Sequence, residues 1–431
     1  MLPKKIAIID GLRTPFIKSW TLFSEIHPVE LGRIVVQELI WRNNLSPSLI
    51  SEVIFGNIAQ PVDSINISRV IALKAGIPVD VPAYTVGRNC ASGLEAITSA
   101  AEKISLGLAD VVIGGGVESM SSIPFLYRKK AVDFFQNLQK AKKFRQRLKG
   151  FLKMPLGAFL NPVVGVMEGL RDNVSGMMMG DTAELLAREY KISRLEQDKF
   201  SLMSHQRAEK ATADGKLKEE IVPVFIPPDY KTPVDEDNGI RKGQTLEALS
   251  NLKPFFDRRY GTVTAGNSSQ ITDGAAAMIL MSEERAKELG YEPMGIIRSY
   301  AYAGVEPERM GLGPAMATPL ALKRGGASFK DIQLIEINEA FAAVVIANEI
   351  AFKSKEFASK YYGDSNPLGE INREILNVNG GAIALGHPVA TSGARLVITI
   401  LKEMKRRNLN LGLVALCVGG GQGGSLLLEI K

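Results

Sequence analysis

Short runs of β-branched and other apolar residues alternate along the chain with stretches whose apolar positions repeat at helical spacing. The first run, at residues 6–10, predicts a strand, and a later run at 82–86 leads directly into a helical pattern at 91–108. In each half the order reads strand, helix, strand, helix, strand, helix, strand, strand. Such an order predicts an α/β protein with a mostly parallel sheet covered by helices.

The first and last portions of the chain look like two copies of one unit. The strand at 51–57 corresponds to 332–338, and the turn that opens a helix at 90–93 corresponds to 390–393. Each pair is separated by about 280–300 residues, which indicates a duplicated α/β unit.

The final strands of the two copies lie closer together. Residues 274–280 and 424–430 are about 150 apart, so roughly 150 residues are inserted in the first copy. The insertion contains a basic stretch, a helical segment at 180–216 and loops rich in Pro and Asp, and long irregular loops are usually functional. The predicted domains are a first half at 1–117 with 266–285, an inserted loop domain at 118–265, and a second half at 286–431.

Composition narrows the class of protein. The 431 residues are 45% hydrophobic, which is enough for two or three packed lobes rather than one core. Two cysteines exclude a disulfide framework and suit a reducing, cytoplasmic setting. The apolar run after the first lysines is too short for a secretory signal, and no segment approaches the roughly 20 apolar residues that span a bilayer.

The net charge of +6 is modest but unevenly spread. Residues 128–153 hold ten Lys or Arg against one acid, and the remainder of the chain is close to neutral, which does not suggest nucleic acid. Residues 134–152 place apolar side chains on one helical stripe with cations on the other faces, the pattern of an interfacial helix on an anionic membrane. A solvated charged face, or docking onto a partner subunit, would also account for it.

Cys90, in Arg-Asn-Cys-Ala-Ser-Gly, follows an apolar strand and opens a helix. A thiol at a helix N-terminus feels the positive end of the dipole, which favours the nucleophilic thiolate. An isolated cysteine is more commonly a buried structural residue. The helix-start position, and Ala390 at the matching position of the second half, favour a nucleophile instead.

Two glycine-rich segments carry the other candidate groups. His387 lies in a loop opened by two glycines and could act as the base for Cys90, whereas His27 and His205 read as ordinary packed or surface residues. Cys417 ends a buried strand and is followed by Gly419, in a glycine run whose free N–H groups could form an oxyanion hole or simply a turn.

Asn338 follows the end of another predicted strand, in Asn-Glu-Ala-Phe-Ala. Its carboxamide could hold a water molecule or a carbonyl oxygen. The alternative is an ordinary helix N-cap, a role that Asn performs well.

Four motifs in this order resemble the signatures of the thiolase family, and the resemblance covers nearly the whole chain. They are Asn-Cys-Ala-Ser-Gly, Asn-Glu-Ala-Phe-Ala, Gly-Gly-Ala-Ile-Ala-Leu-Gly-His-Pro and Cys-Val-Gly-Gly-Gly. The resemblance implies duplicated halves that form an α-β-α-β-α layered core with an inserted loop domain. Several further segments look most like the β subunits of fatty-acid-oxidation multienzyme complexes.

The resemblance also implies roles for individual residues. Cys90 would carry the acyl thioester, His387 would activate it, and Cys417 would protonate the departing enolate of acetyl-CoA. Asn338, through a water molecule, and His387 would form one oxyanion hole, and the N–H groups of Cys90 and Gly419 would form the other.

Four further residues match positions that lie near bound substrate in relatives. Ser269 and Arg241 match contacts to coenzyme A, and Met179 and Met310 match thioethers near the acyl pocket, although Met there is equally a core residue. Ala390 stands where many thiolases have Gly, and Met178 where many short-chain members have His. Some close relatives carry His in place of Asn338.

The function implied is a degradative 3-ketoacyl-CoA thiolase of fatty acid β-oxidation, with coenzyme A as cosubstrate and no metal or permanently bound cofactor. The alternatives are a biosynthetic acetoacetyl-CoA thiolase and an inactive scaffold or lipid-binding subunit. The expected partners are acyl-CoA, coenzyme A, a second copy in a homodimer and a hydratase/dehydrogenase α subunit. The expected location is the cytoplasm, with peripheral membrane contact through residues 128–153.

Overall fold

The computed structural model describes residues 3–363 and 365–430. It divides into two compact units. The main unit comprises Met1–Ser122 and Asp172–Lys431, and the inserted unit comprises Ile123–Arg171. The segment that forms a unit of its own is therefore shorter than the insertion read from the sequence.

The strands of the first half pair in the order β1-β10-β5-β3-β4 within one large sheet. β1 and β5 flank β10 as antiparallel neighbours, and β5, β3 and β4 run parallel to one another. These strands are β1 (Ile6–Arg13), β3 (Glu52–Gly56), β4 (Ala83–Val86), β5 (Val111–Ser119) and β10 (Thr272–Ser282).

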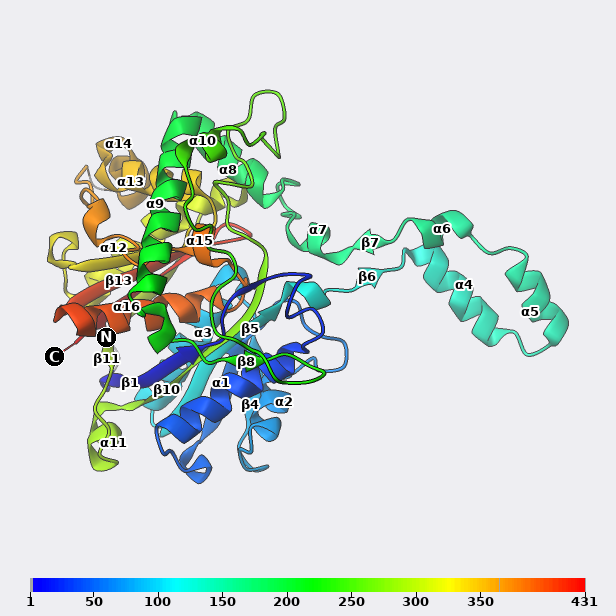
Figure 1. Cartoon of the computed structure of the whole chain (residues 1–431), viewed down its shortest axis with the longest axis horizontal. Helices are drawn as coiled ribbons and strands as arrows, with labels where there is room; N and C mark the ends of the chain where they lie inside the picture. Colours follow the sequence, from blue (N-terminus) through cyan, green and yellow to red (C-terminus); the bar gives the residue numbers. More distant parts are fainter. Residues whose placement is uncertain (1–2, 364, 431) are drawn as a thin grey trace. The chain divides into compact units, whose positions relative to one another are not determined.

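The second half repeats this arrangement. Its strands pair in the order β11-β14-β13-β12, with the first two pairings antiparallel and the last parallel. The expectation of a mostly parallel sheet is therefore wrong, because antiparallel pairings outnumber parallel ones among the described strands of the large sheet. Where the first half has β4, the second has an isolated parallel bridge between Ile335 and Leu376. The strands are β11 (Gly295–Gly304), β12 (Leu334–Ile337), β13 (Leu411–Val418) and β14 (Gln422–Glu429), and β11 pairs with β1 to join the halves (Figure 1).

Alternate residues of each strand face different hydrophobic clusters, which defines the layers. In β1, Ala7 and Ile9 face a cluster that contains α1 and α2, whereas Ile6 and Ile8 face one that contains α3 and α16. The same central cluster takes residues of β13 and β14, whose other faces meet α13. The predicted order α-β-α-β-α is therefore observed. These helices are α1 (Pro28–Arg42), α2 (Ile67–Lys74), α3 (Ser92–Ser105), α12 (Gly313–Gly325), α13 (Ala342–Lys353) and α16 (Ser392–Arg407).

The two central helices cross at a pair of glycines. A Cβ added to Gly93 of α3 would lie 2.7 Å from the carbonyl oxygen of Ala390, and one added to Gly393 of α16 would lie 2.7 Å from the backbone nitrogen of Leu94. Both obstacles are backbone atoms, so only glycine permits this approach. The crossing holds the start of α3 against the start of α16.

The rest of the main unit contains short elements and two longer helices. The single helical segment expected at 180–216 is wrong, because Lys191 has a φ of 55° and Ser193 caps a second helix. The elements are α8 (Met179–Glu189), α9 (Arg194–Ala213), α10 (Leu246–Ser250), α11 (Glu283–Glu288), α14 (Lys355–Phe357), α15 (Ala382–Leu385), β2 (Ile17–Lys18), β8 (Val224–Phe225) and β9 (Pro233–Val234). No helix among the described residues is long and apolar enough to cross a bilayer.

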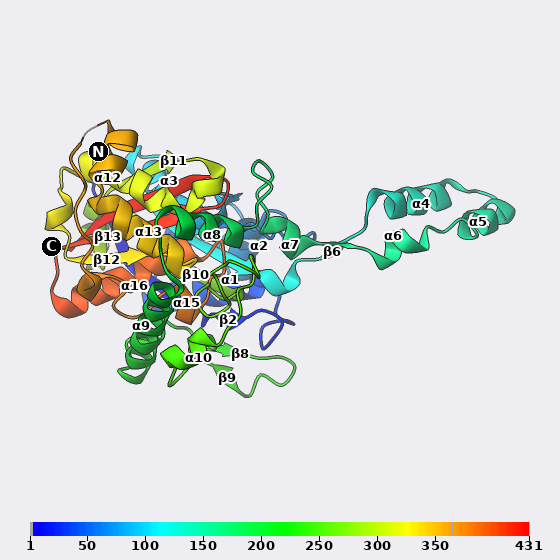
Figure 2. The same ribbon diagram turned by 90° about the horizontal axis from the view of Figure 1, so that it is seen from above.

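The inserted unit is a helical hairpin closed by a two-stranded ribbon (Figure 2). The single helix predicted at 134–152 is wrong: α4 ends where Ala141 turns to extended backbone, and α5 starts after Lys143. An edge-to-face aromatic cluster joins these helices to the ribbon, and its members are Tyr127, Phe134, Phe135, Phe151 and Phe159. The elements are β6 (Phe125–Leu126), α4 (Lys129–Lys140), α5 (Phe144–Phe151), α6 (Leu156–Leu160), β7 (Val163–Val164) and α7 (Gly165–Gly169).

Candidate active site

Cys90 lies in a tight turn between β4 and α3 rather than in the first turn of the helix. A 3₁₀ turn spans Asn89–Ala91, and α3 begins at Ser92, so the expected helix at 91–108 starts one residue late and ends three residues early. Asn89 has a φ of 41°, an uncommon conformation for a residue other than glycine. Its side-chain Nδ2 donates to the carbonyl oxygen of Gly419 at 2.7 Å, which fixes the turn against the end of β13.

The pKa of the Cys90 thiol is raised, chiefly because burial disfavours the thiolate. Hydrogen bonds from the backbone N–H groups of Gly419 and of Cys90 itself act in the opposite direction. The expected lowering by the helix start is thus outweighed in the free protein. The thiol needs a base, and the two N–H groups beside its sulfur are placed to stabilise negative charge.

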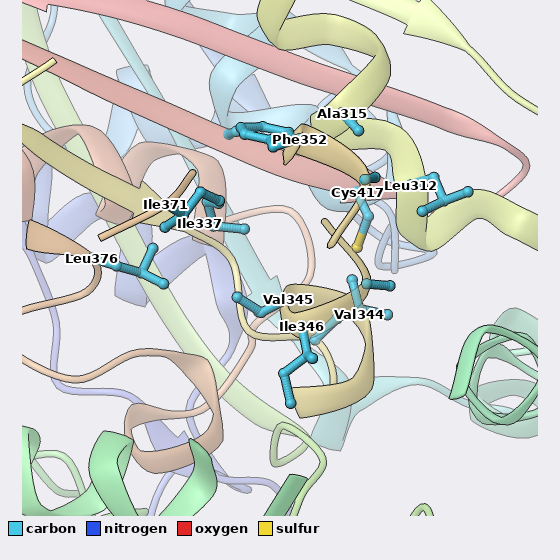
Figure 3. Close-up of a cluster of buried hydrophobic side chains, with 14 of the residues drawn as sticks. Leu312, Ala315, Ile337, Val344, Val345, Ile346, Phe352, Ile371, Leu376 and Cys417 are labelled. Carbon is cyan, nitrogen blue, oxygen red and sulfur yellow. The ribbon is translucent and has the colours of Figure 1, made fainter. Parts of the chain in front are cut away.

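Cys417 is the penultimate residue of β13 and brings a second thiol close to the first. It is buried in an apolar cluster beside Leu312 and Val344 (Figure 3). Burial raises the pKa of the Cys417 thiol, and the charge of Cys90 raises it further, so Cys417 is protonated at neutral pH. A protonated thiol beside a nucleophile is suited to donate a proton.

The glycine run after Cys417 needs its glycines for different reasons. Gly420 and Gly421 have φ values of 89° and 81°, which side chains disfavour. Gly419 leaves room instead, since a Cβ there would lie 3.3 Å from Sδ of Met179. Met179 therefore lies beside the Gly419 backbone and the Cys90 turn.

The hydrogen bonds of His387 are compatible with a proton on Nδ1. Its Nδ1 lies 2.5 Å from Oγ of Ser392, whose hydroxyl is also within reach of the carbonyl oxygen of Pro388 at 3.2 Å. When the Ser392 hydroxyl donates to Pro388, Nδ1 carries the proton and Nε2 keeps a free lone pair. Burial, and then the charge of Arg395, lowers the pKa of His387 to about 4, so the ring is neutral at physiological pH.

Asn338 connects the histidine to the second cysteine. Its backbone N–H donates to Ala415 on β13, and its side-chain Nδ2 lies 3.5 Å from Nε2 of His387. Its Oδ1 is buried and has no hydrogen-bond partner among the described residues. The residue at the N-cap of α13 is Phe341, so the alternative of an N-cap role for Asn338 is wrong.

Two buried carboxylates that the motifs did not single out hold the catalytic loops. Glu339 accepts from Oγ of Ser204 at 2.6 Å, from Nδ2 of Asn377 at 2.9 Å and from the backbone N–H of Ile383 at 3.2 Å. It thereby fixes the loop that leads to His387. The signal in the sequence was its place directly after Asn338.

The second carboxylate, Glu118, spans the two halves. Its Oε1 accepts from the backbone N–H of Ala59 at 2.9 Å, and its Oε2 accepts from that of Ala390 at 3.1 Å. Burial raises its pKa to about 7. No local sequence pattern predicts a role for Glu118, because its hydrogen-bond partners come from segments far away in the chain.

The three remaining residues expected near bound substrate, Ser269, Met310 and Arg241, lie on different segments. Ser269 donates its backbone N–H to Ala340, in the motif that starts at Asn338, and Met310 is buried in the same apolar cluster as Cys417. Arg241 lies on a loop that reaches the His387 segment through Gln270, whose side chain donates to Gly239 and whose carbonyl oxygen accepts from His387. The structure thus brings Cys90, Cys417, Gly419 and Met179 together, and it places His387 against Asn338. The candidate active site thus combines residues that are far apart in the sequence.

Comparison with known sequences agrees with this geometry. The family described as Thiolase, N-terminal domain, matches residues 6–284, and Thiolase, C-terminal domain, matches residues 291–430. The 3-ketoacyl-CoA thiolase of Pseudoalteromonas translucida is 44% identical over 426 residues, which cover 99% of this chain and 97% of that protein. The 3-ketoacyl-CoA thiolase of Escherichia coli (strain SMS-3-5 / SECEC) is 44% identical over 431 residues, which cover 100% and 98%.

Solved structures share the fold over its full length. The Bacillus anthracis acetyl-CoA acetyltransferase matches with a TM-score of 0.86 and 39% identity, covering 99% of both chains. The human mitochondrial 3-ketoacyl-CoA thiolase in complex with CoA matches with a TM-score of 0.85 and 32% identity, covering 100% of this chain and 99% of that chain.

Proposed function

The chain belongs to the thiolase family, and from that premise we propose that it is a degradative 3-ketoacyl-CoA thiolase of fatty acid β-oxidation. The enzyme would cleave a 3-ketoacyl-CoA with coenzyme A into acetyl-CoA and an acyl-CoA two carbons shorter. The observation that carries this proposal is that two thiols, Cys90 and Cys417, lie close together. The backbone of Gly419 contacts the turn that holds Cys90, and Gly419 follows Cys417 by two residues.

In the first step Nε2 of His387 accepts the proton of Cys90, and the sulfur attacks the 3-keto carbon. The neutral ring and its free Nε2 suit this role. Asn338, through a water molecule, and the protonated His387 are proposed to donate to the oxyanion that forms.

In the second step the C2–C3 bond breaks, its electron pair passes to C2, and an acyl group remains on Cys90. Cys417 donates its proton to C2 and so releases acetyl-CoA. The thiol of free coenzyme A then attacks the thioester, with its proton passing to the Cys417 thiolate. The bond between the acyl carbon and the Cys90 sulfur breaks to release the shorter acyl-CoA, and the protonated His387 returns its proton to Cys90. The N–H groups of Cys90 and Gly419 are proposed to stabilise the second oxyanion.

The proposal is tested by the intact mass of the protein after mixing with 3-ketohexadecanoyl-CoA or acetoacetyl-CoA, without free coenzyme A. A tetradecanoyl adduct that is absent in Cys90→Ala is the expected result. An acetyl adduct alone would favour the biosynthetic acetoacetyl-CoA alternative, a class to which the acetyl-CoA acetyltransferase neighbour belongs by name. No adduct from either substrate would leave an inactive scaffold or lipid-binding subunit.

Coenzyme A is proposed to enter as cosubstrate along Ser269 and Arg241, with Met179 and Met310 beside the acyl group. No permanently bound cofactor or metal is proposed, because two thiols, a base and two sets of donors supply the chemistry. The solved neighbour in complex with CoA supports the choice of cosubstrate.

The proposed domains remain a first half at 1–117 with 266–285, an inserted domain at 118–265 and a second half at 286–431. The repeated strand order supports the two halves. Within the insertion, residues 123–171 separate from the rest, whereas α9 packs in the core of the main unit.

The inserted unit is proposed to make peripheral contact with an anionic membrane from the cytoplasmic side. It exposes large apolar side chains next to its cations, including Phe144, Leu152 and Leu160 at 79%, 82% and 83%. Binding to anionic vesicles tests this role. A homodimer and an α subunit with hydratase and dehydrogenase activity are the proposed protein partners, and the molar mass of the purified protein with and without that subunit tests both.

A further inference from the structure

A buried arginine and a buried glutamate join two elements that lead to the candidate active site. Arg395 on α16 is fully buried, and its Nη1 donates to Oε2 of Glu336 on β12 at 2.8 Å. Nε and Nη2 of Arg395 have no hydrogen-bond partner among the described residues. Glu336 is therefore the one acceptor that the described part of the chain offers to this guanidinium.

The position of Glu336 on β12 connects it to Asn338. Leu334 faces the central hydrophobic cluster that contains α16, whereas Ile337 faces the cluster that contains α13. Because side chains alternate along a strand, Glu336 shares the central face with Leu334, and Asn338 continues that face two residues later. The ladder with β13 extends as far as the backbone N–H of Asn338, so the alternation is maintained to that residue.

The position of Arg395 on α16 connects it to His387. Ser392, whose Oγ contacts Nδ1 of His387, precedes Arg395 by three residues on this helix. Residues three apart lie on the same face of a helix. The bond from Arg395 to β12 therefore lies about one helical turn from the place where Nδ2 of Asn338 is 3.5 Å from Nε2 of His387.

Stability alone does not account for this buried pair. Taking charged groups out of water is costly, and an apolar pair of similar volume is often as stable. Burial raises the pKa of Glu336 to about 8, against the opposing charge of Arg395. A carboxyl group keeps an acceptor oxygen whether or not it carries a proton, so the bond does not require an ionised Glu336. What the bond fixes in either form is the distance between β12 and α16.

We infer that Arg395 and Glu336 are positioning residues for the reaction, because their bond fixes β12 to α16 and thereby places Asn338 against His387. The inference rests on the proposed function, in which His387 takes the proton of Cys90 and Asn338 donates to the oxyanion through a water molecule. A displacement of about 1 Å in a catalytic group can lower a rate about a hundredfold. A bond outside the reacting atoms can therefore control the chemical step.

The test separates the length of the Glu336 side chain from its charge. Glu336→Gln keeps the length and an acceptor oxygen, whereas Glu336→Asp keeps the charge and is one methylene shorter. The rate of acyl-adduct formation at Cys90 from 3-ketohexadecanoyl-CoA is measured by quenched flow and intact mass, and is normalised to the folded fraction. Glu336→Gln is expected within about twofold of the wild type, and Glu336→Asp about tenfold slower, with half-saturating substrate concentrations unchanged within about twofold. Arg395→Met, which has no donor, is expected to be as slow as Glu336→Asp.

Thr399→Val is the matched control, since Thr399 lies one turn beyond Arg395 on α16 and its hydroxyl donates to Glu220 at 3.0 Å rather than to β12. This variant should keep the wild-type rate. A slow Glu336→Gln with a normal Glu336→Asp would assign the role to charge and overturn the inference, as would equal losses in both. If Arg395→Met does not fold, the two Glu336 variants still decide. The wild type is measured first, because absence of its adduct would contradict the proposed function itself.

Discussion

At the scale of single residues, the site depends on the hydroxyl group of Ser392, which fixes the imidazole ring of His387. Ser392 holds Nδ1 of His387 and is itself within reach of Pro388, so the free lone pair is kept on the nitrogen that faces Asn338. The base is therefore set by a side chain that takes no part in the chemistry.

Ser392→Ala is expected to lower kcat for thiolysis at least tenfold, because the ring loses the partner that selects its tautomer. KM for coenzyme A should change little, and the yield of acyl adduct at long times should stay complete. Stopped-flow kinetics of adduct formation measure the effect. Ser201→Ala, which removes a buried hydroxyl bonded only within α9, is the control, and equal rates in both variants would contradict the assignment.

The residues proposed to carry the chemistry could be selected from the sequence because each stands in a distinctive local setting. Cys90, His387 and Cys417 sit beside glycines at predicted element ends. Glu118 was not predictable, since its partner Ala390 is brought to it only by the folded chain. The sign of the shift in the Cys90 pKa was missed because burial is a property of the whole fold.

At the scale of elements, the crossing of α3 and α16 sets the distance between the halves of the site. Only two bare backbones can approach as Gly93 and Gly393 do. The Ser-Gly dipeptide that occurs in both halves indicated that the two glycines correspond, although the contact between them was not predicted.

Gly93→Ala is expected to destabilise the fold by about 1–3 kcal/mol and to abolish activity, because the new methyl group meets backbone atoms that cannot rotate away. Thermal unfolding followed by circular dichroism measures the loss. Gly169→Ala, where no atom lies within 4 Å of the added Cβ, should leave the melting temperature unchanged. A Gly93→Ala protein as stable as the control would show that the helices can move apart freely.

Element boundaries were less predictable than element types. The break before α9 had a sequence signal, since Ser193 and Glu196 form a capping box. The break between α4 and α5 had none, because residues 141–143 contain neither Gly nor Pro and continue the apolar spacing. The repeated strand order was predictable because both copies show the same alternation of strands and helices.

At the scale of the whole molecule, two buried histidines make stability depend on pH. Burial lowers the pKa of both His205 and His387 to about 4, whereas an unfolded histidine titrates near 6.5. Between about pH 6.5 and 4 the unfolded chain binds protons that the folded chain does not. Their stabilisation is thus complete above about pH 6.5, falls as the pH drops towards 4 and is constant below that.

Each histidine contributes up to about 3 kcal/mol to this acid destabilisation. Urea unfolding at pH 7 and pH 5 measures the difference. His205→Gln keeps an acceptor for Arg241 and should flatten the dependence. The same loss between the two pH values in that variant would rule out His205 as a source.

The inserted unit predicts membrane binding that salt weakens. Changing Lys140, Lys142, Arg145 and Lys149 to Glu should abolish flotation with anionic vesicles, since each exposed cation adds about 1 kcal/mol near such a surface. The control changes four exposed lysines of the main unit, which are Lys199, Lys218, Lys287 and Lys323. Equal flotation of the two variants would remove the membrane role and leave a protein partner.

The division of the site between the halves has a consequence for synthesis on the ribosome. The thiol of Cys90 emerges early, whereas Asn338, His387 and Cys417 emerge last. Until the second half folds onto the first, the thiol has neither a base nor the Gly419 backbone beside it, and its raised pKa does not yet apply. A nascent chain therefore carries an ordinary cysteine through the acyl-CoA pool of the cell, and the proposed capacity to form an acyl-enzyme appears only once the second half has folded onto the first.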